Sequence, residues 1–289
     1  MKVRSFPLRH RLISFLRDLD IRGIRRLSVV LPKILLPKPA DVGQHILKTP
    51  DGIKLIIDPV NDHGVEMSLY ETGTYEKGIL DYIRKHFKQD GVFVDVGANI
   101  GLMSFFVSRY FPNATIHAFE AHPETVEILR KNVDLNAFSG NISVYPYALG
   151  AVRSKVVISA DTDANRGGAS IVRQGTNAHE VECFPLDEVL KESRIDLLKI
   201  DVEGYELPVL EGAKQLIEAY HPTLILEISQ EREQIGNVDV IWNYLQDIGY
   251  EVYILKGGKE RRSQLLRVDS ISQLPSHDNV VCFHPSHIK

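Results

Sequence analysis

The chain has 289 residues, of which 44% are hydrophobic and 25% are charged. These values are typical of soluble globular proteins and exclude disordered, collagen-like and fibrous classes. The net charge of -4 combines a basic segment, residues 1–40 with ten Lys or Arg and two acids, and an acidic remainder with 24 basic and 36 acidic residues. The acidic body argues against nucleic acid as a partner, because such binding depends on phosphate neutralisation by Lys and Arg.

Residues 1–40 are predicted to form an amphipathic helical arm that ends in a proline-rich linker. The apolar positions with helical spacing are Leu8, Leu12, Phe15, Leu16 and Leu19. The uncharged stretches are too short for a transmembrane helix, and arginines interrupt any signal-peptide-like segment. Two interpretations stay open: a solvated or core-packing helix, and a peripheral contact of residues 1–38 with an anionic membrane at the inner face.

The two cysteines, Cys183 and Cys282, lie in strand-like apolar segments. We therefore expect buried free thiols, which suit a reducing cytoplasm.

Residues 41–90 are expected to form a lead-in hairpin, 45–48 with 53–57 around a Thr-Pro-Asp-Gly turn, followed by a helix over 75–88. In residues 91–289 strands and helices alternate, which predicts an α/β fold with a doubly wound, mostly parallel sheet and an antiparallel end. The expected main strands are 92–96, 115–119, 142–145, 197–200, 224–228, 250–254 and 280–283. An insertion at 151–184 holds two strand-like segments and a long polar loop.

The strongest local motif is VFVDVGANIG at residues 92–101. A buried strand ends in Asp95, turns through Gly97 and Gly101 and enters a helix, which is typical of a cofactor-binding turn. A dinucleotide site remains an alternative, but the spacing is G-x-x-x-G and not G-x-G-x-x-G. Asp95 would repel a pyrophosphate and attract a ligand that carries ammonium and sulfonium groups. Glu120, at the end of the next strand, can accept hydrogen bonds from both ribose hydroxyls of NAD or S-adenosylmethionine.

Together with FEAHP at 119–123, ALG at 148–150 and KIDVEGYE at 199–206, this motif resembles the FkbM family of S-adenosylmethionine-dependent methyltransferases. The segment GTYE at 73–76 is similar to a further family element. The resemblance implies the class I methyltransferase Rossmann-like fold, with a mostly parallel seven-stranded sheet and an antiparallel last strand. It also implies O-methylation of a sugar, glycan or natural-product hydroxyl. The basic arm lies outside it.

Carried over by position, Asp95 and the turn after it would hold the methionine part of S-adenosylmethionine, Glu120 the ribose, and Tyr147 with Ala148 the adenine. The full set that the resemblance assigns to the cofactor is Glu76, Asp95, Gly97, Ala98, Asn99, Gly101, Glu120, Ala121, Tyr147, Ala148 and Asp201.

Methyl transfer to an alcohol requires a base that removes the hydroxyl proton. Asp201 and Glu203 follow a predicted strand at the carboxyl edge of the sheet, and Glu227 lies near the same edge. We predict Asp201 as base or substrate anchor and Glu203 as second candidate, with Lys199 paired to one of them. The same three carboxylates could instead hold Mg²⁺, which prefers oxygen ligands; no metal ligand is assigned.

The acceptor is predicted to lie under the loop at 161–178, where Arg166 and Ser170 are tentative substrate contacts; His63 is a further candidate. Two other functions stay open: an NAD-dependent oxidoreductase, and a non-catalytic cofactor-binding subunit of a glycan-assembly complex. The sequence leaves the acceptor, small molecule or glycan, and the oligomeric state undetermined.

Overall fold

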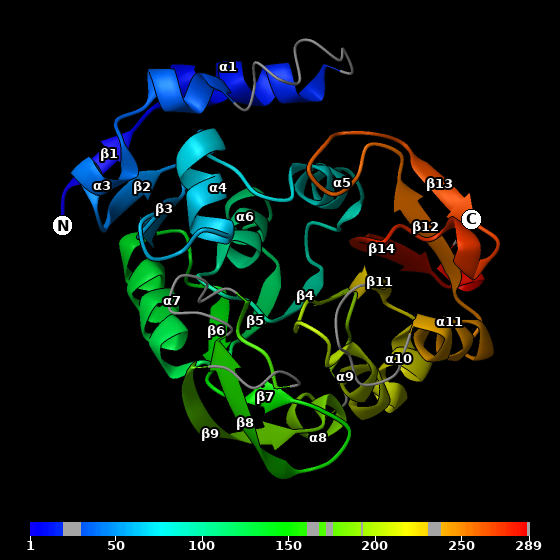
Figure 1. The fold of residues 1–289 in the computed structure, drawn as a ribbon. Helices are drawn as coiled ribbons and strands as arrows, with labels where there is room; N and C mark the ends of the chain where they lie inside the picture. Colours follow the sequence, from blue (N-terminus) through cyan, green and yellow to red (C-terminus); the bar gives the residue numbers. More distant parts are fainter. Residues whose placement is uncertain (20–29, 161–167, 172–175, 192, 231–237, 288–289) are drawn as a thin grey trace.

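The computed structural model describes residues 1–19, 30–160, 168–171, 176–191, 193–230 and 238–287. Its centre is an eight-stranded sheet in the order β13-β12-β14-β11-β10-β4-β5-β6 (Figure 1). The strands are β4 (Val92–Val96), β5 (Thr115–Phe119), β6 (Ile142–Tyr145), β10 (Leu197–Ile200), β11 (Thr223–Ser229), β12 (Glu251–Leu255), β13 (Leu265–Val268) and β14 (His277–Phe283). The strands from β6 to β11 pair in parallel, and β14 is antiparallel to both β11 and β12. The predicted α/β fold is confirmed, and the difference is β13, which adds an eighth strand at the edge.

The apolar runs of the sequence form these strands because both faces of the sheet are covered. Neighbouring residues alternate between two hydrophobic clusters: Phe93 and Leu197 belong to one, and Val94 and Leu198 to the other. All four side chains are at most 3% exposed. Strands covered on both faces read as continuous apolar segments, which is why β4, β5 and β10 have the predicted bounds. The edge strand β6, with no buried residue, matches its predicted bounds as well.

The helices form a layer on each face of the sheet (Figure 1). Buried residues of α5 (Lys77–His86), α6 (Leu102–Tyr110) and α7 (Pro123–Leu135) pack in one cluster. Buried residues of α9 (Glu206–Gly212), α10 (Lys214–Tyr220) and α11 (Val238–Asp247) pack in the other, with the short α8 (Leu186–Val189). Two 3-10 helices, η2 (Ile271–Gln273) and η3 (Pro285–His287), complete the C-terminal part.

Two small sheets flank this core. The predicted hairpin is β2 (His45–Lys48) and β3 (Lys54–Ile57), and it is extended by β1 (Val3–Ser5), which pairs in parallel with β2. The insertion forms β8 (Ser154–Ala160) and β9 (Thr176–Phe184) beside β7 (Ala148–Leu149). The first residues of the arm therefore join the lead-in sheet rather than forming a separate unit.

The arm contains the predicted helix, α1 (Pro7–Asp18), and the short α3 (Pro39–Val42). α1 packs on α4 (Val65–Thr72), where the His10 Nε2 atom lies 2.9 Å from the Tyr70 carbonyl oxygen. In the part of the chain described here, no helix has both the length and the hydropathy needed to cross a bilayer. Both cysteines are buried and free, as predicted.

Candidate functional site

A cavity lies at the carboxyl ends of the central strands. Open α/β sheets bind ligands at this edge. Thirteen of the predicted residues line it: Glu76, Asp95, Gly97, Ala98, Asn99, Glu120, Ala121, Tyr147, Ala148, Lys199, Asp201, Glu203 and Glu227. The fold thus brings together residues from six separate segments of the chain.

The turn after β4 can only be built with glycine at its first position. Gly97 has φ +79°, and a Cβ atom there would lie 1.9 Å from the Asp201 carbonyl oxygen. The amides of Gly97 and Ala98 both donate to the Phe119 carbonyl, at 3.0 and 2.9 Å. The turn is therefore pressed against the loops that follow β5 and β10, and its backbone faces the cavity without intervening side-chain bulk.

Asp95 is a buried carboxylate with one oxygen that lacks a hydrogen-bond partner among the described residues. It is 1% exposed, its Oδ2 atom accepts a hydrogen bond of 2.7 Å from Ser104 Oγ, and its Oδ1 atom has no protein partner among the described residues. Burial raises the pKa of this carboxyl, against the opposing effect of Lys199. A buried oxygen without a partner is costly, so a cationic or hydrogen-bond-donating ligand at this position would stabilise the site.

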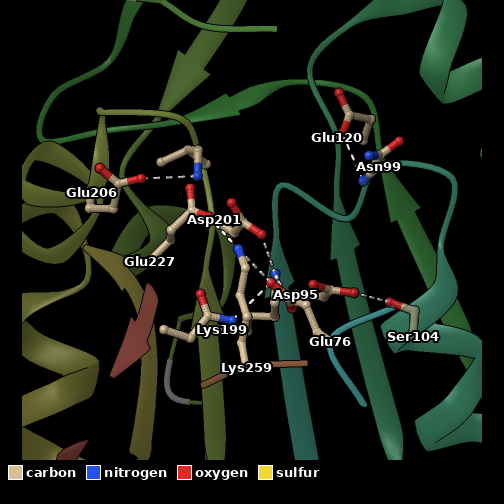
Figure 2. A network of polar contacts seen from close by, with 12 residues as sticks. Glu76, Asp95, Asn99, Ser104, Glu120, Lys199, Asp201, Glu206, Glu227 and Lys259 are labelled. Atoms are coloured by element: carbon tan, nitrogen blue, oxygen red, sulfur yellow. Dashed lines mark hydrogen bonds and ion pairs between the residues drawn. The ribbon is translucent and has the colours of Figure 1, made fainter. Parts of the chain in front are cut away.

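Glu120 also lines the cavity and is held by two backbone amides, one of which, that of Asn99, is seen in Figure 2. Its Oε2 atom accepts from the Asn99 amide at 2.9 Å, and its Oε1 atom accepts from the His122 amide at 2.8 Å. Burial raises its pKa to about 6, although these amides and that of Ala121 act in the opposite direction. A carboxylate has about four acceptor positions, so two remain for the hydroxyls of a ribose. The apolar side chains nearby, Phe119 and Leu149 among them, suit an adenine ring.

Two lysines and three carboxylates form a second polar cluster, which we call the lysine–carboxylate network: Glu76, Lys199, Asp201, Glu227 and Lys259 (Figure 2). Lys199 Nζ donates to Asp201 Oδ2 at 2.8 Å and lies 3.9 Å from Glu76. Lys259 Nζ lies 2.6 Å from Glu227 and 3.2 Å from Glu76. The predicted pairing of Lys199 is thus present, with Asp201.

The two lysines of the network stay charged because the carboxylates around them compensate for their burial. Burial alone would lower the pKa of Lys199, but Asp201, Glu76 and Asp95 around it raise the pKa well above its ordinary value. Burial would likewise lower the pKa of Lys259, and Glu76 and Glu227 raise it. Both ammonium groups therefore stay protonated at neutral pH.

The members of the network differ in accessibility. The side chains of Glu76 and Glu227 are 1% and 6% exposed, whereas that of Asp201 is 20% exposed. Asp201 is therefore the carboxylate of the network that an acceptor in the cavity can reach most easily.

The carboxylates of the network also have metal-ligand spacing. Among the described residues, oxygens of Glu76, Asp201 and Glu227 lie within 4.8 Å of one another. This trio contains Glu76 where the sequence-based hypothesis had Glu203. The ammonium groups of Lys199 and Lys259 stand beside the same oxygens, so a divalent cation would have to displace them.

Backbone strain concentrates at the cavity. Four described non-glycine residues have positive φ, and three of them, Glu76 (+48°), Asn99 (+52°) and Glu203 (+54°), line it. Such conformations cost free energy and persist where the surroundings enforce them, often at functional sites.

The remaining predicted residues lie elsewhere. Gly101 is the N-cap of α6, with φ +97°, behind the turn. Ser170 is buried and its Oγ donates to the Glu203 carbonyl at 2.8 Å, so it supports the loop wall. His63 is exposed and is not among the lining residues. Arg166 lies outside the described residues.

Sequence reasoning missed three residues that hold the site in place. Lys259 completes the network, Asn279 Nδ2 donates to Glu76 Oε1 at 2.9 Å, and Glu206 Oε1 accepts from the amides of Val202 and Gly204 at 3.2 Å. Burial raises the pKa of Glu206 to about 7. Lys259 follows the carboxyl end of β12, and β12 runs in the same direction as β11. Its position just after this strand is the feature of the sequence from which Lys259 could have been predicted to lie at the site.

Comparisons with known proteins agree with the geometry. The family model of the methyltransferase FkbM domain matches residues 95–252. Among curated proteins, the chain is similar to "Methyltransferase 1" of Beauveria bassiana, with 30% identity over 149 residues that cover 44% of this chain and 59% of that protein. It is also similar to "Methyltransferase sdnD" of Sordaria araneosa, with 29% identity over 193 residues, 55% of this chain and 73% of that protein.

A third relative is the hexuronic acid methyltransferase AglP of Haloferax volcanii, with 24% identity over 153 residues, 52% of this chain and 61% of that protein. Among solved structures, an FkbM methyltransferase from Methylobacillus flagellatus aligns with a TM-score of 0.46 and 16% identity, covering 96% of this chain and 58% of that one. The chain therefore matches less than two thirds of the length of Methyltransferase 1, namely 59%.

Proposed function

Because the chain belongs to the FkbM family of S-adenosylmethionine-dependent methyltransferases, we propose that it transfers the methyl group of S-adenosylmethionine to a hydroxyl of a sugar, glycan or related natural product. The observation that carries the proposal is the shared cavity. It joins two buried carboxylates, Asp95 and Glu120, to a third, Asp201, that is ion-paired and accessible. The similarity to a hexuronic acid methyltransferase supports a sugar acceptor.

The residues of the cavity fit a cofactor that is cationic at one end and carries a ribose at the other. Asp95 would stabilise the cationic end, Glu120 would accept from the ribose hydroxyls, and Tyr147 with Ala148 would line the adenine pocket. When bound, S-adenosylmethionine supplies an activated methyl carbon to which the acceptor oxygen forms its new bond as the carbon–sulfur bond breaks.

The protein's own task is then to orient the acceptor oxygen and to accept its proton. We assign this task to Asp201, because it combines accessibility with a fixed carboxylate. Lys199 holds that carboxylate at 2.8 Å. Glu76 forms an ion pair with Lys199, and Glu227 forms one with Lys259, so these two buried carboxylates hold the lysines in place. General base catalysis of this kind contributes about 10²–10⁴-fold to a rate.

Cofactor affinity is expected to depend on pH through Glu120. Its pKa of about 6 exceeds the ordinary value of 4.5, so the carboxylate loses its charge as the pH falls through about 6. A protonated carboxyl has fewer acceptor positions for the ribose, so affinity should fall by up to about tenfold per pH unit below that value. Isothermal titration calorimetry at pH values above and below 6 measures the affinity for S-adenosylmethionine.

Glu120→Gln is the control, since the amide does not titrate. The variant should bind more weakly at neutral pH and lack the step near pH 6. An unchanged step in the variant would assign the titration to another group, such as Glu206.

The acceptor can be sought by mass spectrometry of cell-surface glycans and metabolites with and without the gene. The proposal predicts one species that loses the mass of one CH₂ group when the gene is deleted. Purified protein with S-adenosylmethionine should restore that mass in vitro. A species that instead changes by the mass of two hydrogen atoms in a reaction that needs NAD would support the oxidoreductase. No change of mass with either cofactor would support the non-catalytic subunit.

A further inference from the structure

Exposed apolar side chains concentrate on the N-terminal arm. Twelve large hydrophobic residues are exposed in the described part of the chain, and seven of them lie within residues 1–34. These seven are Met1, Val3, Leu8, Leu12, Phe15, Val30 and Ile34. The other five, Val60, Val152, Val157, Val240 and Leu266, are scattered over different elements.

One face of α1 packs on the body of the protein. His10 and Ile13 are fully buried there. At the end of the helix, Arg17 lies 3.4 Å from Glu71, and Asp18 forms an ion pair with Lys77. These contacts fix the rotation of the helix about its axis.

The opposite face of α1 points away from the protein. Leu8, Leu12 and Phe15 are spaced four and three residues apart, which places them on one face of a helix. They are 80%, 47% and 59% exposed. In Figure 1, α1 lies across one end of the molecule, with the folded body on one side of it. The apolar stripe of the sequence is thus present, but it is not the face that packs.

The arm also exposes basic side chains, and two of them, Arg9 and Arg11, lie on α1 beside the apolar face. Lys2, Arg9, Arg11, Lys33 and Lys38 are exposed. The acid in the described part of the arm, Asp18, is paired with Lys77. A helix with Leu and Phe on one face and Arg at its flanks is the composition of interfacial helices that lie in the headgroup region of a bilayer.

We propose that the described part of the arm, residues 1–19 and 30–38, docks the protein on the surface of an anionic lipid bilayer through the Leu8–Leu12–Phe15 face and its exposed basic side chains. A second copy of this chain is a poorer match. Two arms would bring like charges together, and the described body offers no other concentration of exposed apolar side chains to receive the arm. A bilayer supplies both an apolar layer and negative charge.

Docking would also place the cavity close to the membrane. α1 packs on α4; Val65 at the start of α4 and Tyr75 with Glu76 just beyond its end line the cavity. The docking does not depend on the reaction. The expectation that the acceptor hydroxyl is presented at a membrane rests on the proposed function.

Vesicle sedimentation of the full-length protein tests the docking. Wild-type protein should bind vesicles of phosphatidylcholine mixed with phosphatidylglycerol, bind phosphatidylcholine vesicles much more weakly, and dissociate as salt is raised. The triple variant Leu8→Ser, Leu12→Ser, Phe15→Ser should bind the mixed vesicles at least about tenfold more weakly. The double variant Val152→Ser, Val157→Ser, with exposed apolar side chains on the body, should bind like wild type.

Since all substituted side chains are exposed, the three proteins should melt at the same temperature, which separates docking from folding. Equal binding of the triple variant and wild type would overturn the proposal, as would equal binding to both vesicle types. If the wild-type protein were a dimer that did not bind vesicles, and the triple variant were a monomer, the apolar face would be assigned to contact with a second copy of the chain.

Discussion

Asp201→Asn is expected to lower the rate of methyl transfer by about 10²–10⁴-fold while S-adenosylmethionine still binds. The amide has the shape of the carboxylate but cannot accept the acceptor's proton. Asp201 is the member of the lysine–carboxylate network with an accessible side chain, 20% exposed against 1% for Glu76 and 6% for Glu227. The measurement is single-turnover methyl transfer to the acceptor found by the mass comparison, with the cofactor affinity determined separately by calorimetry.

Two further variants make this result specific. Asp196→Asn changes a carboxylate just before the same strand, at the opposite edge of the sheet, where it accepts from the Val92 amide at 2.9 Å. It should leave the rate of transfer unchanged. Glu203→Gln tests the second candidate base. A loss of rate in Glu203→Gln with an unaffected Asp201→Asn would move the assignment to Glu203. Unchanged rates in both variants would exclude Asp201 and Glu203 as the base.

Lys199→Met is expected to lower the free energy of unfolding by about 3–5 kcal/mol, because it leaves buried carboxylates without their cation. Lys199 is 4% exposed, lies on the central strand β10, and contacts Asp201 and Glu76. Its neighbours raise its pKa, so its stabilising effect is fully present below the ordinary lysine pKa and is lost only as the pH rises above it. Denaturant unfolding near neutral pH measures the difference.

The matched control is Lys214→Met, which removes a lysine 3.8 Å from Glu218 where both side chains are more than half exposed. Exposed pairs of this kind contribute less than about 1 kcal/mol. Equal stability of the two variants would contradict the description of the network as buried and mutually compensated.

The fold could be predicted closely where burial on both faces dictates the sequence. The strands β4, β5 and β10 have the expected bounds because each is a short, largely buried apolar run between turn signals. The edge strand β6 also has the expected bounds, although none of its four residues is buried. β1 and β13 could not be found in the same way. Each has no more than four residues at the edge of a sheet, with exposed positions in between, and its pairing depends on where its neighbour happens to lie.

The residues of the candidate site could likewise be predicted in part, depending on whether they come from the parallel or the antiparallel part of the sheet. Asp95, Glu120 and Asp201 are predictable because each comes at or just after the end of a parallel strand, and those ends meet at one edge. Lys259 and Asn279 come from the antiparallel end of the sheet, where the direction of each strand must be known before its residues can be assigned to an edge. The amphipathic stripe of α1 predicted the helix but not its rotation, which ion pairs and the buried His10 decide.

The central claim is that the cavity binds S-adenosylmethionine. Isothermal titration calorimetry of the full-length protein with S-adenosylmethionine and, in parallel, with NAD tests it most directly. Saturable one-to-one binding of S-adenosylmethionine, with no heat of binding for NAD, is the expected result. Binding of NAD without binding of S-adenosylmethionine would contradict the account.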